Sequence, residues 1–271
     1  MSADAAQLTS TPAEVDLPAR LVGAIAPHAG WVCSGRVAGL VLRALADQSD
    51  AVTFFLTGSV HTMELTRPAL SEADRWQTPL GEVAVDVELR DALAAVDGFE
   101  LNEDPHRYEH ALEVQLPLMQ HLWGERLRIV PCMIPPVSEA TDWGAALGDV
   151  LRDWPEPVVM LASSDLTHYG PNYDYQPAGP GAEGYRWAHE VNDRALIDRM
   201  VAMRADRIVA QAAADRSACG GGAIAAVMAA SARLGAQSGY LLEHTDSTRE
   251  LAPLGYGDEH NSVGYAGIVF G

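Results

Sequence analysis

The chain has 271 residues, 48% of them hydrophobic, with 37 acidic against 18 basic residues and a formal net charge of −19. This composition is typical of a globular protein with a sizeable core, and we expect one domain spanning residues 1–271. An acidic surface repels phosphates and argues against nucleic-acid binding, and the absence of lysine excludes a Schiff-base lysine and a Walker-type phosphate loop.

The chain begins with MSADAAQLTSTPAEVD, which has neither a basic start nor an apolar stretch. It therefore does not read as a signal peptide, and we expect residues 1–16 to form a flexible tail. No window approaches the roughly 18 uninterrupted apolar residues of a membrane span. We accordingly expect a cytoplasmic protein that binds no membrane.

Beyond the tail, apolar runs alternate with amphipathic segments. Several runs are continuously apolar, which is typical of strands covered on both faces. The pattern predicts a single three-layer α/β/α domain with a largely parallel central sheet, to which the last strand adds in the antiparallel direction. The predicted strands cover residues 21–26, 52–58, 127–134, 158–163, 239–244 and 263–270. The predicted helices cover a segment capped by Ser34, then 86–97, 109–122 (kinked or shortened by Pro117), 138–152, 183–203 and 220–234.

Three of these predicted strands are followed by a histidine. His28 follows the first strand, His61 the second and His168 the fourth. Because ligands bind at the carboxyl ends of the strands in open α/β sheets, we expect the three histidines to share one site. Asp165 lies on the same short loop as His168, where it either orients ligands and assists acid–base chemistry or caps the following turn.

Cys219 precedes three glycines and an apolar helix in SACGGGAIAAVM. Backbone amides at a helix N-terminus favour a thiolate, and glycines allow a close approach of the backbone. Two imidazoles and one anionic ligand are typical of mononuclear non-haem iron sites, although a thiolate also suits copper or zinc. Cys33 and Cys132 are expected to be single, buried thiols.

Five segments, PHAGWVCSG, EHALEVQLPLM, SSDLTHYG, CGGGAI and VGYAG, resemble the Memo family in sequence and order. This is the family of the AmmeMemoRadiSam system protein B, and its fold is similar to that of type III extradiol ring-cleavage dioxygenases. The resemblance covers nearly the whole chain. It implies that His28, His61 and Cys219 are metal ligands, that Asp165 lines the pocket, and that His168 is the acid–base residue.

The same resemblance places two substrate-binding candidates. His110 matches the histidine of the EHALEVQLP segment and is expected near the metal, while Trp31 stands where the family usually has tyrosine and is expected at the pocket mouth. Two further departures are GSVH in place of a more usual GPxH before His61, and Cys219 where the dioxygenases have glutamate. The second departure argues against ordinary catechol ring cleavage.

The implied function is that of a metal-dependent oxidoreductase, a dioxygenase-like enzyme that uses Fe(II) and acts on a small-molecule substrate. The family further implies a radical-SAM pathway partner. Two alternatives stay open: a non-catalytic metal-binding or adaptor protein of the Memo type, and a zinc-dependent hydrolase in which the metal activates water.

Overall fold

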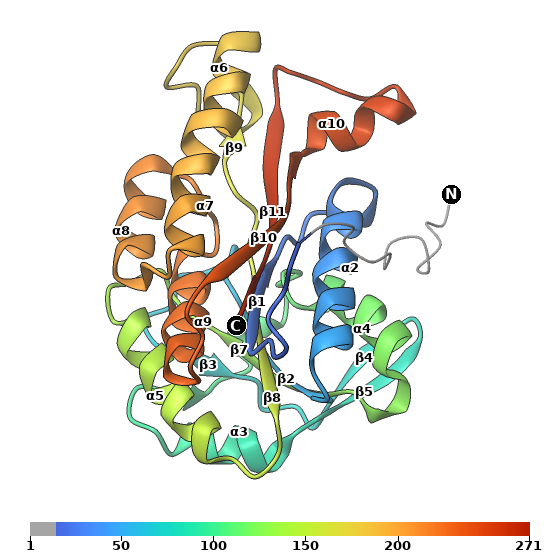
Figure 1. The fold of residues 1–271 in the computed structure, drawn as a ribbon, viewed down its shortest axis with the longest axis vertical. Helices are drawn as coiled ribbons and strands as arrows, with labels where there is room; N and C mark the ends of the chain where they lie inside the picture. Colours follow the sequence, from blue (N-terminus) through green and yellow to red (C-terminus); the bar gives the residue numbers. More distant parts are fainter. Residues whose placement is uncertain (1–14) are drawn as a thin grey trace.

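The computed structural model describes residues 15–271; most of the predicted tail, residues 1–14, lies outside the described residues. One large mixed sheet runs through the molecule (Figure 1), and parallel strands form its middle in the order β1-β8-β2-β7. The prediction of a parallel sheet centre is therefore confirmed. These four strands are β1 (Gly23–Ala26), β8 (Val158–Ser163), β2 (Thr53–Gly58) and β7 (Arg128–Met133).

The two edges of the sheet are mixed. β11 (Ser262–Phe270) pairs antiparallel with β1, as expected, and β10 (Gly239–Asp246) then pairs antiparallel with β11. At the other edge β7 pairs antiparallel with β3 (Ala69–Leu70) and parallel with β5 (Gly81–Val85), which forms a hairpin with β4 (Arg75–Thr78). The remaining strands are β6 (Glu100–Leu101) and β9 (His168–Tyr169).

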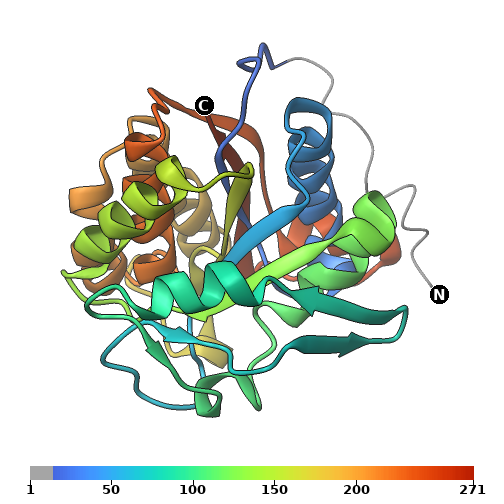
Figure 2. The same ribbon diagram turned by 90° about the horizontal axis from the view of Figure 1, so that it is seen from below.

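Helices cover both faces of the sheet (Figures 1 and 2). One face carries α2 (Trp31–Gln48) and α4 (Leu116–Trp123). The opposite face carries α3 (Val87–Ala94), α5 (Ala140–Asp153), α7 (Arg194–Val201), α8 (Ala205–Asp215) and α9 (Gly221–Arg233). The other helical segments are α6 (Ala182–Trp187), α10 (Ser247–Leu251), the π-helical η5 (Ala188–Asp193), and the 3₁₀ turns η1 (Asp104–His106), η2 (Glu113–Gln115), η3 (Gly124–Arg126), η4 (Pro171–Tyr173) and η6 (Ala252–Leu254).

Strand β2 shows why the central strands are continuously apolar. Successive side chains of a strand point to opposite faces. Phe55 packs into the cluster beneath α5 and α9, whereas Phe54 and Leu56 pack into the cluster beneath α2 and α4. Both faces are thus buried, which confirms the three-layer architecture.

Three helix predictions need correction. Ser34 does not cap α2, because the helix already begins at Trp31 after Gly30, and the Ser34 hydroxyl instead donates a hydrogen bond to the Ala29 carbonyl at 2.8 Å. Pro117 lies in the first turn of α4, where its missing N–H costs nothing, so the helix predicted over 109–122 is shortened to Leu116–Trp123, as one of the two alternatives had it, and is not kinked. The predicted helix 183–203 is divided into α6, η5 and α7, and α8 was missed.

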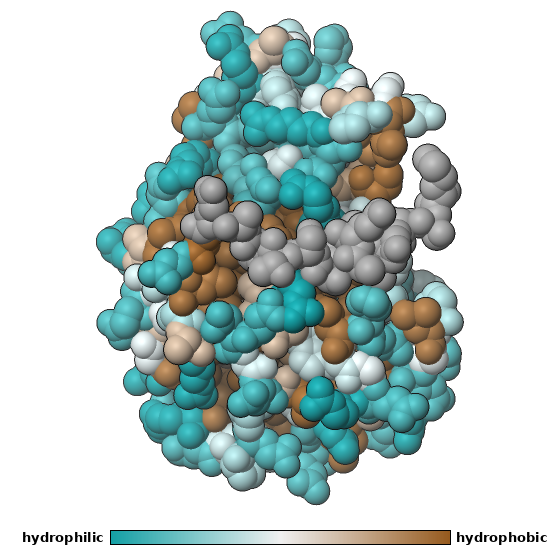
Figure 3. All heavy atoms as spheres, turned by 45° about the vertical axis from the view of Figure 1, so that its right-hand side comes forward, coloured by the Kyte–Doolittle hydropathy of each residue, from teal (hydrophilic) through white to brown (hydrophobic). Residues whose placement is uncertain are grey.

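Figure 3 shows one face covered mainly by hydrophilic residues, with smaller patches of hydrophobic ones between them. Within residues 15–271 no helix is both long and apolar enough to span a bilayer.

Candidate metal site

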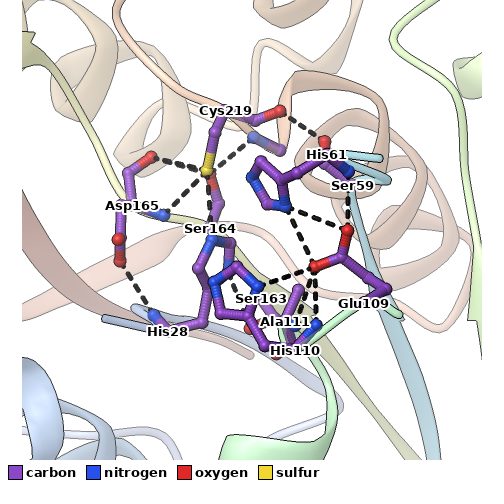
Figure 4. Close-up of polar contacts among 11 residues, drawn as sticks. His28, Ser59, His61, Glu109, His110, Ala111, Ser163, Ser164, Asp165 and Cys219 are labelled. Atoms are coloured by element: carbon purple, nitrogen blue, oxygen red, sulfur yellow. Dashed lines mark hydrogen bonds and ion pairs between the residues drawn. The ribbon is translucent and has the colours of Figure 1, made fainter. Parts of the chain in front are cut away.

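Three side chains predicted as metal ligands meet at the carboxyl edge of the sheet. His28 follows β1, His61 follows β2, and Cys219 precedes α9. The Sγ atom of Cys219 lies 3.3 Å from Nε2 of His28, and one ligand atom from each of the three residues lies within 4.8 Å of the others (Figure 4). Such spacing suits donor atoms that could share one metal ion.

The ring of His28 is held by a buried hydroxyl. The Ser163 hydroxyl donates to the Ala111 carbonyl at 2.6 Å, so its lone pair accepts a hydrogen bond from Nδ1 of His28 at 3.1 Å. The backbone N–H of His28 donates to Asp165 at 2.8 Å. Nδ1 therefore carries the proton, and the Nε2 lone pair faces Cys219.

His61 is held by a carboxylate that the sequence analysis did not single out. Nδ1 of His61 lies 3.0 and 3.1 Å from the two carboxylate oxygens of Glu109, and the His61 backbone N–H donates to the same carboxylate at 2.6 Å. Hydrogen bonding to Cys219, and then to Glu109, raises the pKa of His61 to about 9. Burial would raise the pKa of Glu109, but hydrogen bonds from His61 and from the Ala111 amide outweigh it and lower that pKa to about 2.

Cys219 is placed by a tight approach of α9 to the strand ends. The backbone N–H of Asp165 donates to the Cys219 sulfur at 3.3 Å. A Cβ on Gly220 would lie 2.6 Å from the Ser164 Cβ, and one on Gly222 would lie 2.1 Å from the Pro135 carbonyl oxygen. Only glycine fits at these contacts, so the glycine run serves the close packing that was expected of it.

Asp165 lies beside the cluster, and its carboxylate is occupied by backbone amides. It is buried, and Oδ1 accepts hydrogen bonds from the N–H groups of His28 at 2.8 Å and Ala29 at 3.3 Å. Of the two roles considered for Asp165, the orientation of a ligand is the one that these contacts support.

His168 faces the cavities next to the cluster. Its Nδ1 lies 3.1 Å from the Leu166 carbonyl, which can only accept, so Nδ1 carries a proton and Nε2 is the basic nitrogen. The ring packs edge-on against Tyr173, with 5.1 Å between centroids. Burial lowers the pKa of His168 below that of free histidine. The group therefore stays neutral, and able to accept a proton, to a lower pH.

A second histidine cluster supports the His168 loop. Asp193, which is fully buried, accepts hydrogen bonds from the Thr167 amide at 3.0 Å and from the His189 ring at 2.8 Å, and His244 lies 3.3 Å away. The other ring nitrogen of His189 is 2.7 Å from the Ser262 hydroxyl. Because protein groups already satisfy these atoms, the cluster holds the loop in place.

The two substrate-binding candidates lie in different places. The His110 ring is 5.5 Å from that of His28 and 5.2 Å from that of His61, between centroids, so the structure brings it to the site. The Trp31 indole donates to the Val114 carbonyl at 2.9 Å and lines another cavity, beside Pro117. None of the three predicted ligands lines that cavity.

The other two cysteines differ from each other. Cys132 is buried in β7, as predicted, whereas Cys33 is only half-buried and lines a cavity together with His168 and Tyr265. The prediction of burial is therefore wrong for Cys33, because the first turn of α2 borders an open cavity. All three thiols are free.

Glu109 is the functional candidate that sequence reasoning missed. A signal for it existed, since Glu109 precedes His110 in EHALEVQLP and metal-binding histidines usually donate their outer N–H to a carboxylate or carbonyl. That carboxylate cannot be chosen from the sequence, because the chain has 37 acidic residues.

Glu109→Gln is expected to weaken metal binding about 10–100-fold, because loss of such an outer partner leaves the His61 ring less well oriented and less basic. Titration of metal-free protein with Fe(II) under anaerobic conditions measures the effect. The control is Glu113→Gln, four residues further on and exposed, which should not change the affinity. Equal affinity in the Glu109 and Glu113 variants would contradict the positioning role.

The comparisons with known proteins agree with one another. A family model described as "Memo-like protein" matches residues 5–269. A MEMO1 family protein of Methanopyrus kandleri is 35% identical over 260 residues, covering 94% of this chain and 85% of the relative. One of Methanosarcina barkeri is 34% identical over 252 residues, covering 92% and 86%. The crystal structure of an uncharacterized Escherichia coli K12 protein covers 93% of this chain and all of its own, with a TM-score of 0.59 and 12% identity, which shows a common fold.

Proposed function

Because this chain belongs to the Memo family, we propose that it is a metal-dependent oxidoreductase in which His28, His61 and Cys219 hold Fe(II). The observation that carries the proposal is the convergence of these three side chains at one edge of the sheet. Segments separated by up to 191 residues, as Cys219 and His28 are, meet there with their ligand atoms facing one another.

The donor set fits a metal ion. In both histidines Nδ1 has a protein partner, Ser163 for His28 and Glu109 for His61, which leaves Nε2 as the ligand atom. This arrangement of outer partners is typical of metal-binding histidines. Two imidazoles and one anionic donor, with other coordination positions open, suit a non-haem Fe(II) site. Copper and zinc also accept such donors, and for this reason the metal itself has to be measured.

When bound, Fe(II) supplies electron transfer and the activation of oxygen. The protein's own contribution is to orient groups and to move protons. The Leu166 carbonyl keeps the proton of His168 on Nδ1, so Nε2 accepts a proton from a substrate in the adjoining cavity. Asp165 keeps the backbone of His28 in place, and Glu109 keeps the ring of His61 in place.

The test is metal analysis of protein purified without oxygen, followed by oxygen electrode measurements with candidate small molecules. We expect the protein to take up Fe(II) stoichiometrically and to consume oxygen in the presence of a substrate. A protein that retains only zinc and hydrolyses its substrate without regard to oxygen would contradict the proposal.

A further inference from the structure

Two cavities of about 430 Å³ each border the candidate metal site, and His168 and Tyr173 line both. One of them also contains Asp165 and Asp258. The other, called here the Arg216 cavity, contains two of the proposed metal ligands. It is lined by His61, His168, Tyr173, Ala212, Ala213, Arg216, Ala218 and Cys219. Its volume lies within the range of small-molecule sites.

The Arg216 cavity is electrostatically unusual for this protein. The chain has 37 acidic and 18 basic residues, yet no aspartate or glutamate is among the described residues that line this cavity. Arg216 supplies a permanent positive charge there. The anionic sulfur of Cys219 belongs to the proposed metal site, so the positive charge of Arg216 has no carboxylate beside it among the described residues of this cavity and favours an anionic ligand.

The Arg216 guanidinium is held in one position. Nη1 donates to the Asp174 carbonyl at 3.0 Å, Nη2 donates to the Tyr173 carbonyl at 2.9 Å, and the group lies 4.6 Å from the centre of the Tyr175 ring. These contacts leave further N–H groups of the guanidinium available, since it carries five. A fixed guanidinium loses little freedom when it binds a carboxylate or phosphate.

The backbone at this point is strained. Arg216 has φ 44° and Asp174 has φ 49°, left-handed conformations that residues other than glycine rarely adopt. Such strain costs free energy and is concentrated at functional sites. Here it sets the guanidinium at the cavity that also contains His61, His168 and Cys219.

We propose that the substrate of this protein carries an anionic group, a carboxylate or a phosphate, which binds Arg216 while its reacting group faces the metal ligands and His168. The three alanines of the cavity provide an apolar surface for the body of such a molecule. The inference rests on the proposed function, because it identifies the class of substrate that the same site takes.

Calorimetric titration with three probes tests the proposal: benzoate, phenyl phosphate and benzamide, which is a neutral analogue of benzoate. We expect at least one of the two anions to bind about tenfold more tightly than benzamide, which is the effect of a charge-assisted hydrogen bond. Arg216→Gln should abolish this preference, and Arg216→Lys should restore part of it, because lysine keeps the charge without the planar fork. The exposed Arg186→Gln is the control and should leave it intact.

Whichever anion binds more tightly identifies carboxylate or phosphate as the ligand chemistry. The proposal is wrong if neither anion binds more tightly than benzamide, or if the preference survives in a folded Arg216→Gln protein. Metal content, measured on the same samples, separates this inference from the proposed function. If the protein prefers anions but neither binds iron nor consumes oxygen, only the proposed oxidoreductase function is contradicted. If it binds iron and consumes oxygen but shows no preference for anions, only the role of Arg216 is contradicted.

Discussion

Cys219→Ala is expected to abolish metal binding, and His28→Ala and His61→Ala are expected to do the same. Each substitution removes one of only three proposed ligands, and Cys219 contributes the single anionic one. The loss should exceed the roughly 10–100-fold effect of removing an outer partner such as Glu109. Metal content after anaerobic loading with Fe(II) and gel filtration is the measurement.

Cys33→Ala is the matched control for this experiment. Cys33 is also a free, partly exposed thiol near His168, but it lies outside the group formed by Cys219 and the two histidines. Its variant should retain the metal in full. A Cys219→Ala protein that binds as much iron as Cys33→Ala would show that the sulfur is no ligand, and the metal site as proposed here would be wrong.

The second large effect is expected at His168. His168→Ala should keep its metal and lose about 10²–10⁴-fold in turnover, the usual cost of removing a positioned acid–base group. The metal should stay because the ring of His168 is held by the Leu166 carbonyl and is not part of the cluster of His28, His61 and Cys219. Metal content and oxygen consumption are measured on the same preparation.

The pH dependence provides a further check on His168. Because burial lowers its pKa, the basic form persists as the pH falls, and the acid limb of the rate profile should lie below the value of about 6.5 for free histidine. This limb should disappear in His168→Ala. The control is His121→Ala, an exposed position on α4, which should leave both rate and profile unchanged. Loss of metal in His168→Ala would make this residue a ligand, and full activity would exclude it from catalysis.

The sequence by itself determined the layers of the fold and three of the residues that meet at the carboxyl edge of its sheet. Continuous apolar runs such as residues 52–58 have to be covered on both faces, so a sheet between helices follows from local pattern alone. Strands that run parallel end at the same edge, which is why His28 and His61 were expected to meet. The glycines after Cys219 predicted the close approach that the contacts of Gly220 and Gly222 show.

Only the tertiary structure decided which of the many polar residues serve that edge. Glu109 reaches His61 across 48 positions of the chain, and Asp165 reaches His28 across 137. Hydrogen bonds of this kind depend on how strands and helices pack, and a chain with 37 acidic residues carries no local mark of the two that are used. The same holds for Arg216, whose left-handed backbone and contacts with the loop at 173–175 exist only once α8 ends beside that loop. Which residue follows a strand can be read from the local sequence. Which other side chain it bonds to depends on how segments far apart in the sequence pack together.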